Sequence, residues 1–261
     1  MLNRLVRCAV LLSLLVVLAG CPIDRGNTVT QYATLEALFK GVYDGDMSIG
    51  QLRAAGDFGL GTFNALDGEM VVVDGRVYQA RSDGSVVEAS DDMLTPFAVV
   101  LPMRPQAGVA IAAGLDFAGL SAAIDATLPS KNLIVAARID GVFPGVKIRT
   151  VPRQQKPYPP LPDVIPNQTV TELANVEGTL VILRMPVYIG ALNSAGYHIH
   201  FLSGDHRYAG HVLALQTGQH TAAVDVVPNM NIQLPVTGDF LTAPFNGELA
   251  AGVESDKIFI F

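Results

Sequence analysis

A histidine-rich stretch constrains the fold of this chain more than any other part of the sequence. Residues 196–213 read GYHIHFLSGDHRYAGHVL, in which bulky and polar residues alternate as they do in a half-buried strand. Side chains two residues apart in a strand point to the same face, so His198 and His200 share one face. Residues 203–206 are typical of a turn, and a hairpin centred there places His211 opposite His200 on the return strand. The stretch therefore predicts imidazoles that converge on one face of a sheet.

The convergent imidazoles predict a metal site. The chain has five histidines, and all of them fall between His198 and His220, which argues against scattered strand histidines. Three neutral imidazoles leave a coordination position open, as in catalytic rather than structural zinc sites. Zinc is the favoured ion, although copper, nickel or iron would fit the same ligands. We predict His198, His200 and His211 as the ligands, and we interpret His206 as a solvated turn residue.

The N-terminal residues predict export. An apolar run at residues 8–18 follows two arginines and is too short to span a bilayer comfortably. It leads into LAGC, a lipobox-like motif in which the signal is cleaved before a cysteine that then carries lipid. We therefore predict a lipoprotein signal peptide at residues 1–20, attachment to the membrane through lipid on Cys21, and a tether at residues 21–29. An ordinary cleaved signal with an incidental cysteine is the alternative.

The predicted mature protein is exported and lipid-anchored at the periplasmic or extracellular face of a membrane. Cys8 would leave with the signal and Cys21 would carry lipid, so the folded body is expected to have no disulfide. Half of all residues are apolar and the formal net charge is −7, which argues against nucleic acid as a partner. Residues 30–261 suffice for one large domain or two small ones.

The first half of the body predicts short helices and a β-hairpin. Leucines at helical spacing follow Thr34, and residues 47–56 predict a second short helix. Asp74 and Gly75 mark a two-residue hairpin turn between apolar strands. Glu69 then shares a strand face with valines. Such a carboxyl is either at the water-exposed start of a strand or aimed into an apolar pocket.

The second half predicts further strands and a break. Residues 133–139 and 146–151 are predicted strands. The second of them includes Arg149, whose guanidinium suits a substrate carboxylate, with a surface ion pair as the alternative. The proline-rich residues 152–166 cannot form regular structure and are the predicted boundary between two subdomains, and residues 171–176 predict a short helix. Because predicted strands outnumber helices, we expect an α+β fold with two sheet-rich halves rather than a doubly wound parallel sheet.

Several motifs of the body resemble those of one protein family. They are GDFGLGTFNALDGE (56–69), VKIRTV (146–151), EGTLVILRMP (177–186), GYHIHF (196–201) and AGHVL (209–213). Together they resemble the alpha-acetolactate decarboxylases, bacterial enzymes that convert 2-acetolactate to acetoin and carbon dioxide, over about residues 34–254. The resemblance implies an α+β fold with two similar sheet-rich halves, mixed and antiparallel strands, a few short helices and a metal site between the halves. The family is often dimeric, which leaves a homodimer open.

The resemblance also implies roles for particular residues. It implies that zinc is bound by His198, His200 and His211. Glu69 and Arg149 match the catalytic pair of the family, and Thr62 matches a residue of its substrate pocket. The family uses a further glutamate near its carboxyl terminus, which Glu254 matches, with the nearby Glu248 as the alternative.

The implied reaction is zinc-dependent decarboxylation of 2-acetolactate, a small-molecule substrate. Its ketone and hydroxyl oxygens lie on adjacent carbons and can chelate zinc, which would act as a Lewis acid and stabilise the enediolate left by loss of carbon dioxide. Arg149 would hold the carboxylate or the developing negative charge, and Glu69 or Glu254 would supply the proton. The alternatives are a non-catalytic zinc-binding lipoprotein and a zinc hydrolase of small esters or lactones.

Overall fold

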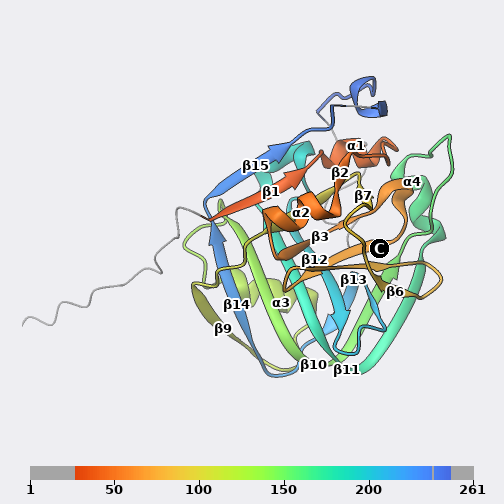
Figure 1. Cartoon of the computed structure of the whole chain (residues 1–261). Coiled ribbons are helices and arrows are strands. Elements are labelled where there is room, and N and C mark those ends of the chain that lie inside the picture. The colour runs from red at the N-terminus through yellow and green to blue at the C-terminus, as the bar shows by residue number, and fades with distance from the viewer. Residues whose placement is uncertain (1–26, 237, 248–261) are drawn as a thin grey trace, which may run out of the picture.

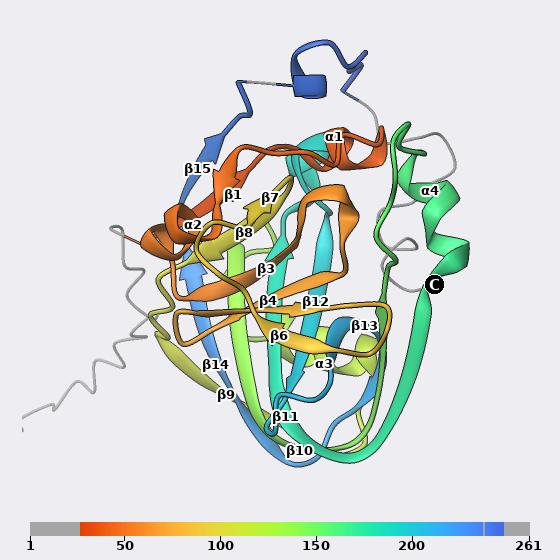
Figure 2. The same cartoon turned by 45° about the vertical axis from the view of Figure 1, so that its right-hand side comes forward.

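The computed structural model of the 261-residue chain describes residues 27–236 and 238–247 (Figure 1). The predicted signal peptide, Cys21 and the C-terminal glutamates Glu248 and Glu254 lie outside these residues. Within the described part, two large β-sheets pack against each other and short helices lie on their outer faces and at their ends (Figure 2). The predicted α+β fold, rich in strands and with few short helices, is confirmed.

The first sheet combines the N-terminal strands with one strand from the far end of the chain. Its described strands are, in spatial order, β15 (Asn229–Gln233), β1 (Thr28–Tyr32), β8 (Ala98–Leu101), β3 (Phe58–Thr62), β4 (Glu69–Val73), β5 (Arg76–Ala80) and β6 (Val86–Glu88). β1 and β15 pair in parallel, whereas the other neighbours pair antiparallel. Beside this sheet, β2 (Met47–Ser48) and β7 (Leu94–Thr95) form a small ladder of their own.

The second sheet is antiparallel and curls around a long two-stranded ribbon. Its described strands are, in spatial order, β11 (Thr169–Met185), β12 (Gly196–Ser203), β13 (Ala209–Gln216), β10 (Ile134–Thr150), β14 (His220–Val227) and β9 (Ala107–Ile111). β10 and β11 also pair with each other along almost their whole length. Because β11 also pairs with β12, and β10 with β13, the strands β11, β12, β13 and β10 form a closed ring of hydrogen-bonded strands.

The helices are short and occupy the connections between strands. The described ones are α1 (Leu35–Phe39), α2 (Ile49–Ala55), α3 (Phe117–Asp125), α4 (Leu161–Val164) and the 3-10 helices η1 (Asn64–Leu66), η2 (Ile165–Asn167), η3 (Val187–Leu192) and η4 (Gly238–Leu241). None of these described helices has the length and apolar character needed to cross a membrane.

Local sequence signals account for the elements of the N-terminal half. The Thr34 side chain accepts a hydrogen bond from the backbone of the first turn of α1. At the start of α2, Ser48 and Gln51 form a reciprocal capping box. Asp74 and Gly75 adopt φ values of 52° and 74°, the left-handed conformation that a two-residue hairpin turn of this kind requires. The predicted helices and the β4–β5 hairpin are thereby confirmed.

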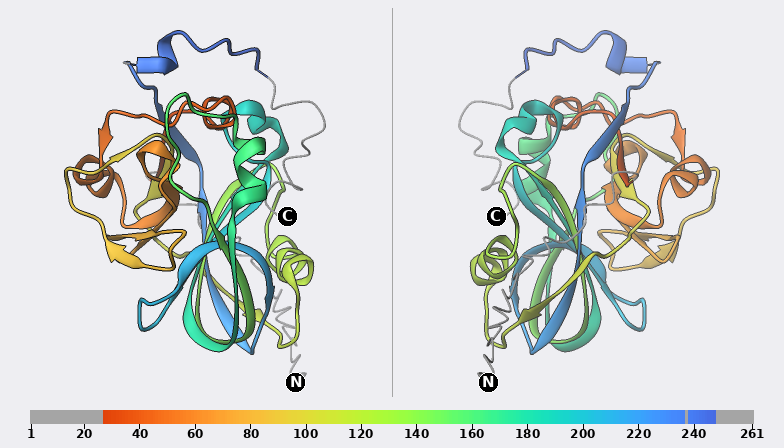
Figure 3. Two further views of the ribbon diagram at one scale, coloured as in Figure 1. Left: turned by 90° about the vertical axis from the view of Figure 1, so that its right-hand side faces the viewer. Right: turned by 90° about the vertical axis from the view of Figure 1, so that its left-hand side faces the viewer.

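Strands of both sheets are buried on both faces. On β4, Met70 and Val72 pack outward with α2, whereas Val71 faces the core between the two sheets. On β12, Leu202 joins the same central core and Phe201 packs on the opposite side with α3. The layers are therefore α2, the first sheet, the second sheet and α3 (Figure 3). Burying one such side chain completely contributes roughly 1.5–3 kcal/mol, so the two sheets are held mainly by this central core.

The β10–β11 ribbon corrects part of the predicted secondary structure. Residues 133–139 and 146–151 are strand as predicted, but they belong to one continuous strand, β10. The predicted helix at residues 171–176 is wrong, because these residues lie in β11 and pair with β10, with Thr171 opposite Ile148. Strand preference depends on the neighbouring strand more than on the segment itself, so a pairing between distant segments overrides the local pattern.

The proline-rich run does not separate the two sheets. Residues 152–160 form an irregular loop that continues into α4 and η2. This loop joins β10 to β11, which are neighbours in the second sheet. The chain instead passes from the first sheet to the second between β8 and β9, and it returns to the first sheet at β15.

Candidate active site

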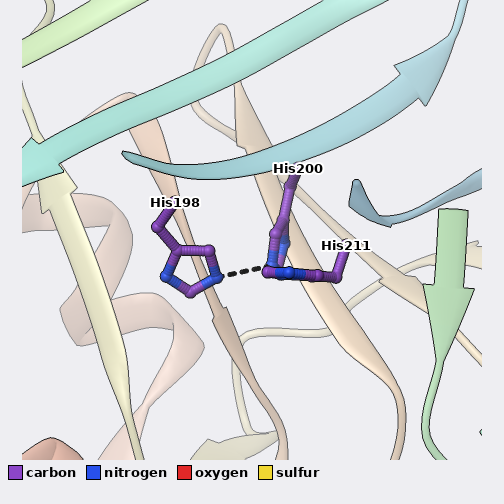
Figure 4. Close-up of side chains that lie close together, drawn as sticks. All are labelled: His198, His200 and His211. Atoms are coloured by element: carbon purple, nitrogen blue, oxygen red, sulfur yellow. Dashed lines mark hydrogen bonds between the residues drawn. The ribbon is translucent and has the colours of Figure 1, made fainter. Parts of the chain in front are cut away.

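Three buried histidines converge between the two sheets. His200 on β12 lies directly opposite His211 on β13, as the hairpin pattern predicts, and His198 precedes His200 by two residues on the same face. The centroids of the three rings lie 4.9–5.3 Å apart (Figure 4). One ring nitrogen of each residue lies within 4.8 Å of the others. This cluster could hold a metal ion.

A backbone contact from the first sheet fixes the tautomer of one imidazole. Nδ1 of His200 lies 2.7 Å from the carbonyl oxygen of Met70 on β4. A carbonyl only accepts hydrogen bonds, so Nδ1 is the protonated nitrogen and donates. The lone pair of the neutral ring is then on Nε2, which lies 3.1 Å from Nε2 of His198. Metal-binding histidines are oriented by such contacts in many proteins.

The environment keeps two of these imidazoles neutral. Burial lowers the pKa of His198 well below its usual value, and the neighbouring charge of Arg149 adds to this effect. Burial also lowers the pKa of His200 to about 3, although its hydrogen bond to the Met70 carbonyl acts in the opposite direction. Both rings are therefore unprotonated at neutral pH, which is the form that binds metal ions.

The spacing of the ring nitrogens fits a first-row metal ion. Two nitrogen ligands on tetrahedral zinc, each about 2.0–2.1 Å from the ion, lie about 3.3 Å apart. The 3.1 Å between Nε2 of His198 and Nε2 of His200 is close to that value. A set of imidazole donors suits zinc, copper, iron or nickel rather than magnesium or calcium.

An acid and an arginine flank the histidine cluster. Arg149 on β10 lies directly opposite His211 on β13. Glu69 on β4 lies opposite Thr62 on β3, so these two come from the first sheet. Oε2 of Glu69 lies 3.6 Å from Nε2 of His200. Because His200 is neutral, this contact joins a carboxyl to an uncharged ring and is no ion pair.

Burial shifts the ionisation of both flanking groups. It raises the pKa of Glu69 to about 7, although the positive charge of Arg149 acts in the opposite direction. It lowers the pKa of the Arg149 guanidinium, which the charge of Glu69 counteracts. A carboxyl with a pKa near neutrality can both release and take up a proton under ordinary conditions.

These groups lie at one pocket of ≈ 440 Å³. This volume includes open solvent at the mouth of the pocket. Its polar lining consists of Thr62, Glu69, Arg149, His198 and His211. His200 borders it through its contacts with Glu69 and His198. The structure thus brings six of the predicted site residues together between the sheets. Glu254 and its alternative Glu248 lie outside the described residues.

The apolar half of this pocket was not predicted from the sequence. Its members are Leu35, Leu38, Gly61, Leu66, Phe97, Val151 and Leu161. They come from α1, η1, α4 and the ends of strands, so no local pattern groups them. Gly61 lets the backbones of β3 and of the segment before β8 approach closely, because a Cβ atom there would lie 2.5 Å from the carbonyl oxygen of Phe97.

The fold and the pocket define an α+β enzyme whose site can hold a metal ion. The family model for alpha-acetolactate decarboxylase matches residues 29–247. The alpha-acetolactate decarboxylases of Methylococcus capsulatus and Methanosarcina mazei are 44% and 40% identical to the chain over 217 and 233 residues. These alignments cover 83% and 89% of this chain, and 84% and 80% of the two relatives.

Solved structures agree with the sequence relatives. The crystal structure of acetolactate decarboxylase from Bacillus subtilis subspecies spizizenii is 36% identical and gives a TM-score of 0.84. The match covers 90% of this chain and 100% of that one. The chain therefore belongs to the alpha-acetolactate decarboxylase family, and the prediction of an enzyme of this kind is confirmed.

Proposed function

We propose that the protein catalyses the zinc-dependent decarboxylation of 2-acetolactate to acetoin and carbon dioxide. The observation that supports this most is the meeting of three imidazoles, a carboxyl with a pKa near 7 and an arginine at one pocket between two sheets. A protein that only binds zinc needs neither the acid nor the arginine beside its ligands. Relatives that share the fold and most of the sequence are alpha-acetolactate decarboxylases.

His198, His200 and His211 would hold the ion. Zinc bound there would act as a Lewis acid on the ketone and hydroxyl oxygens of the substrate and favour the negative charge that develops when carbon dioxide leaves. The protein contributes the neutral state of His198 and His200 and, through the Met70 carbonyl, the orientation of His200. Only three protein ligands surround the ion in this assignment, which leaves room for the substrate.

Arg149 would bind the substrate carboxylate. Among the described residues, Nε and Nη1 of this buried side chain have no hydrogen-bond partner. Buried donors almost always find an acceptor, and a planar guanidinium suits a carboxylate with two oxygens. Arg149 therefore offers unused donors to an anionic substrate, next to His211.

Glu69 would supply the proton that completes the reaction. The bond between C2 and the carboxylate carbon breaks, its electron pair stays on the substrate as an enediolate, and carbon dioxide leaves. Protonated Glu69 then transfers its proton to C2 to give acetoin, and it regains a proton from water. Near neutral pH a substantial fraction of Glu69 is protonated because burial raises its pKa to about 7.

Thr62 would orient the substrate hydroxyl. Its Oγ1 donates a hydrogen bond to the carbonyl oxygen of Gly68 at 2.6 Å. With its only hydrogen engaged, this hydroxyl can serve the pocket as an acceptor. The C2 hydroxyl of 2-acetolactate is a donor that matches it.

The direct test is to incubate the purified folded body, loaded with zinc, with racemic 2-acetolactate and to measure acetoin. We expect acetoin to accumulate at a rate proportional to the concentration of protein, and removal of the metal by a chelator to abolish it. A zinc-loaded, folded protein that forms no acetoin would contradict the proposal and favour a zinc-binding role.

We further propose that the protein is exported and anchored by lipid on Cys21. The LAGC motif supports this proposal. Mass spectrometry of the native protein tests the idea, because an intact mass without added lipid would exclude it. A homodimer stays a prediction that sedimentation of the purified body can check.

A further inference from the structure

The proline-rich loop at residues 152–160 begins and ends at the pocket. Val151 precedes the loop and Leu161 follows it, and both side chains line the pocket. Between them the chain has no regular structure and leaves the second sheet. The shape of the apolar wall therefore depends on how this loop is held.

The start of the loop is tied to the connection between β3 and β4, beside a residue that lines the pocket. The backbone N–H of Gln154 donates to the carbonyl oxygen of Ala65 at 2.7 Å. Nη1 of Arg153 lies 3.2 Å from Oδ2 of Asp67. Ala65 and Asp67 flank Leu66, which lines the pocket.

The end of the loop is tied to the segment that follows α1. The Tyr158 hydroxyl donates to Oδ1 of Asp44 at 3.0 Å, and Nζ of Lys156 lies 2.7 Å from Oδ2 of the same carboxylate. Gly41, at φ +82°, comes so close to the loop that a Cβ atom there would lie 2.9 Å from the carbonyl oxygen of Pro159. These contacts hold the start of α4 beside α1 (Figure 2).

We infer that Leu161 of α4 and Leu38 of α1 set the largest alkyl group that the substrate can have at C2. This inference rests on the proposed function. The histidine site, Thr62 and Arg149 would fix the oxygen atoms of the substrate, so its alkyl groups must point toward the apolar wall. Leu38 and Leu161 are 7% and 6% exposed, whereas the other apolar side chains of the wall are each 2% exposed. The two leucines thus lie nearest to solvent, where a longer alkyl chain would extend.

The test compares two substrates in one protein preparation. They are 2-acetolactate and the homologue in which propyl replaces the methyl group at C2. An extra methylene in a closed hydrophobic pocket changes kcat/KM by about tenfold or more. We therefore expect Leu161→Ala to raise the ratio of kcat/KM for the propyl substrate to that for 2-acetolactate by at least about tenfold. Leu38→Ala is a second variant that should raise the same ratio.

A matched control lies on the same helix. Val164 of α4 is buried in the core between the sheets and is not among the residues that line the pocket. Val164→Ala should reduce stability yet leave the substrate ratio at the wild-type value. Loss of folded protein or of zinc lowers both activities equally, so it does not move the ratio.

Two outcomes would overturn the inference while leaving the proposed function in place. The first is that both leucine variants keep the wild-type ratio of kcat/KM for the two substrates. The second is that this ratio rises as much in Val164→Ala as in the leucine variants. A wild-type protein that does not act on 2-acetolactate at all would instead remove the proposed function, and the inference with it.

Discussion

Arg149 lies directly opposite His211 across the ladder between β10 and β13. His211 in turn lies opposite His200 on β12, so one positive side chain and two imidazoles form a row across three neighbouring strands. Glu69 reaches this row from the other sheet, with Oε2 3.6 Å from Nε2 of His200. A substrate whose carboxylate and ketone are attached to the same carbon would therefore meet the arginine and the proposed metal ligands at the same time.

Replacing the arginine separates its geometry from its charge. Arg149→Lys keeps a positive charge but loses the planar pair of donors that suits a carboxylate. A hydrogen bond to a charged group is worth about 1.5–3 kcal/mol, so kcat/KM for 2-acetolactate should fall by about 10- to 100-fold. Zinc content should not change. Arg138→Lys on the same strand is the control, because Arg138 pairs with Asp74 and Asp140 away from the pocket and should keep full activity. An Arg149→Lys enzyme with normal kcat/KM would exclude the proposed carboxylate contact.

Removing one imidazole should remove the metal and the activity together. We expect wild-type protein to bind about one zinc ion per chain, since the three histidines form one site. His200→Ala leaves two imidazoles, fewer than catalytic zinc sites use, and it also loses the contact with Met70. Metal analysis after dialysis should show little zinc, and acetoin formation should be lost. His206→Ala is the matched control, because His206 lies in the β12–β13 turn and packs on Tyr78 instead. Full zinc in His200→Ala would mean that the ligands are assigned wrongly.

The parts of the site that lie within one hairpin could be predicted from sequence. The alternation around His198 and the turn before His211 fix the register of β12 and β13 locally, and the structure has that register. Asp74 and Gly75 fix the β4–β5 turn in the same way, which sets the strand face of Glu69.

Features that depend on distant pairing could not be predicted in this way. Residues 171–176, predicted as a helix, form a strand because they pair with β10. This pairing joins segments that are distant in the sequence, so no local pattern indicates it. The contact between His200 and the Met70 carbonyl joins residues of two different sheets. The apolar wall combines Leu38 and Leu161, which come together only because the proline-rich loop folds back onto α1.

Neutralising the proposed proton donor should stop the chemistry while sparing the metal. Glu69→Gln keeps the size of the side chain and a hydrogen-bonding group but cannot transfer a proton. General acid catalysis typically contributes about 10²–10⁴-fold, so acetoin formation should fall at least about a hundredfold. Zinc content and folding should stay near those of wild type. Glu172→Gln is the control, since Glu172 pairs with Lys147 at the surface and should turn over normally. If Glu69→Gln keeps wild-type turnover, Glu254 becomes the leading candidate for the proton donor.

The same substitution should change how stability depends on pH. Burial raises the pKa of Glu69 in the folded protein to about 7 from an ordinary value of 4.5. Between these values the folded state binds a proton that the unfolded state has released, so the free energy of unfolding decreases as pH rises. The shift corresponds to about 3 kcal/mol, since one pKa unit is worth about 1.4 kcal/mol. This contribution is fully present below pH 4.5 and is lost by about pH 7.

Glu69→Gln does not titrate, so the wild-type protein should lose about 3 kcal/mol of stability relative to this variant between pH 4.5 and pH 7.5. The comparison uses chelator-treated protein, because a bound cation would favour the charged carboxylate. Urea unfolding of both proteins across this range measures the difference directly. The histidines are present in both proteins, so their contribution cancels from the difference in stability between wild type and Glu69→Gln. Parallel stability curves for wild type and Glu69→Gln would show that folding does not raise the pKa of Glu69, and a proton donor that acts near neutrality would then have to be another group.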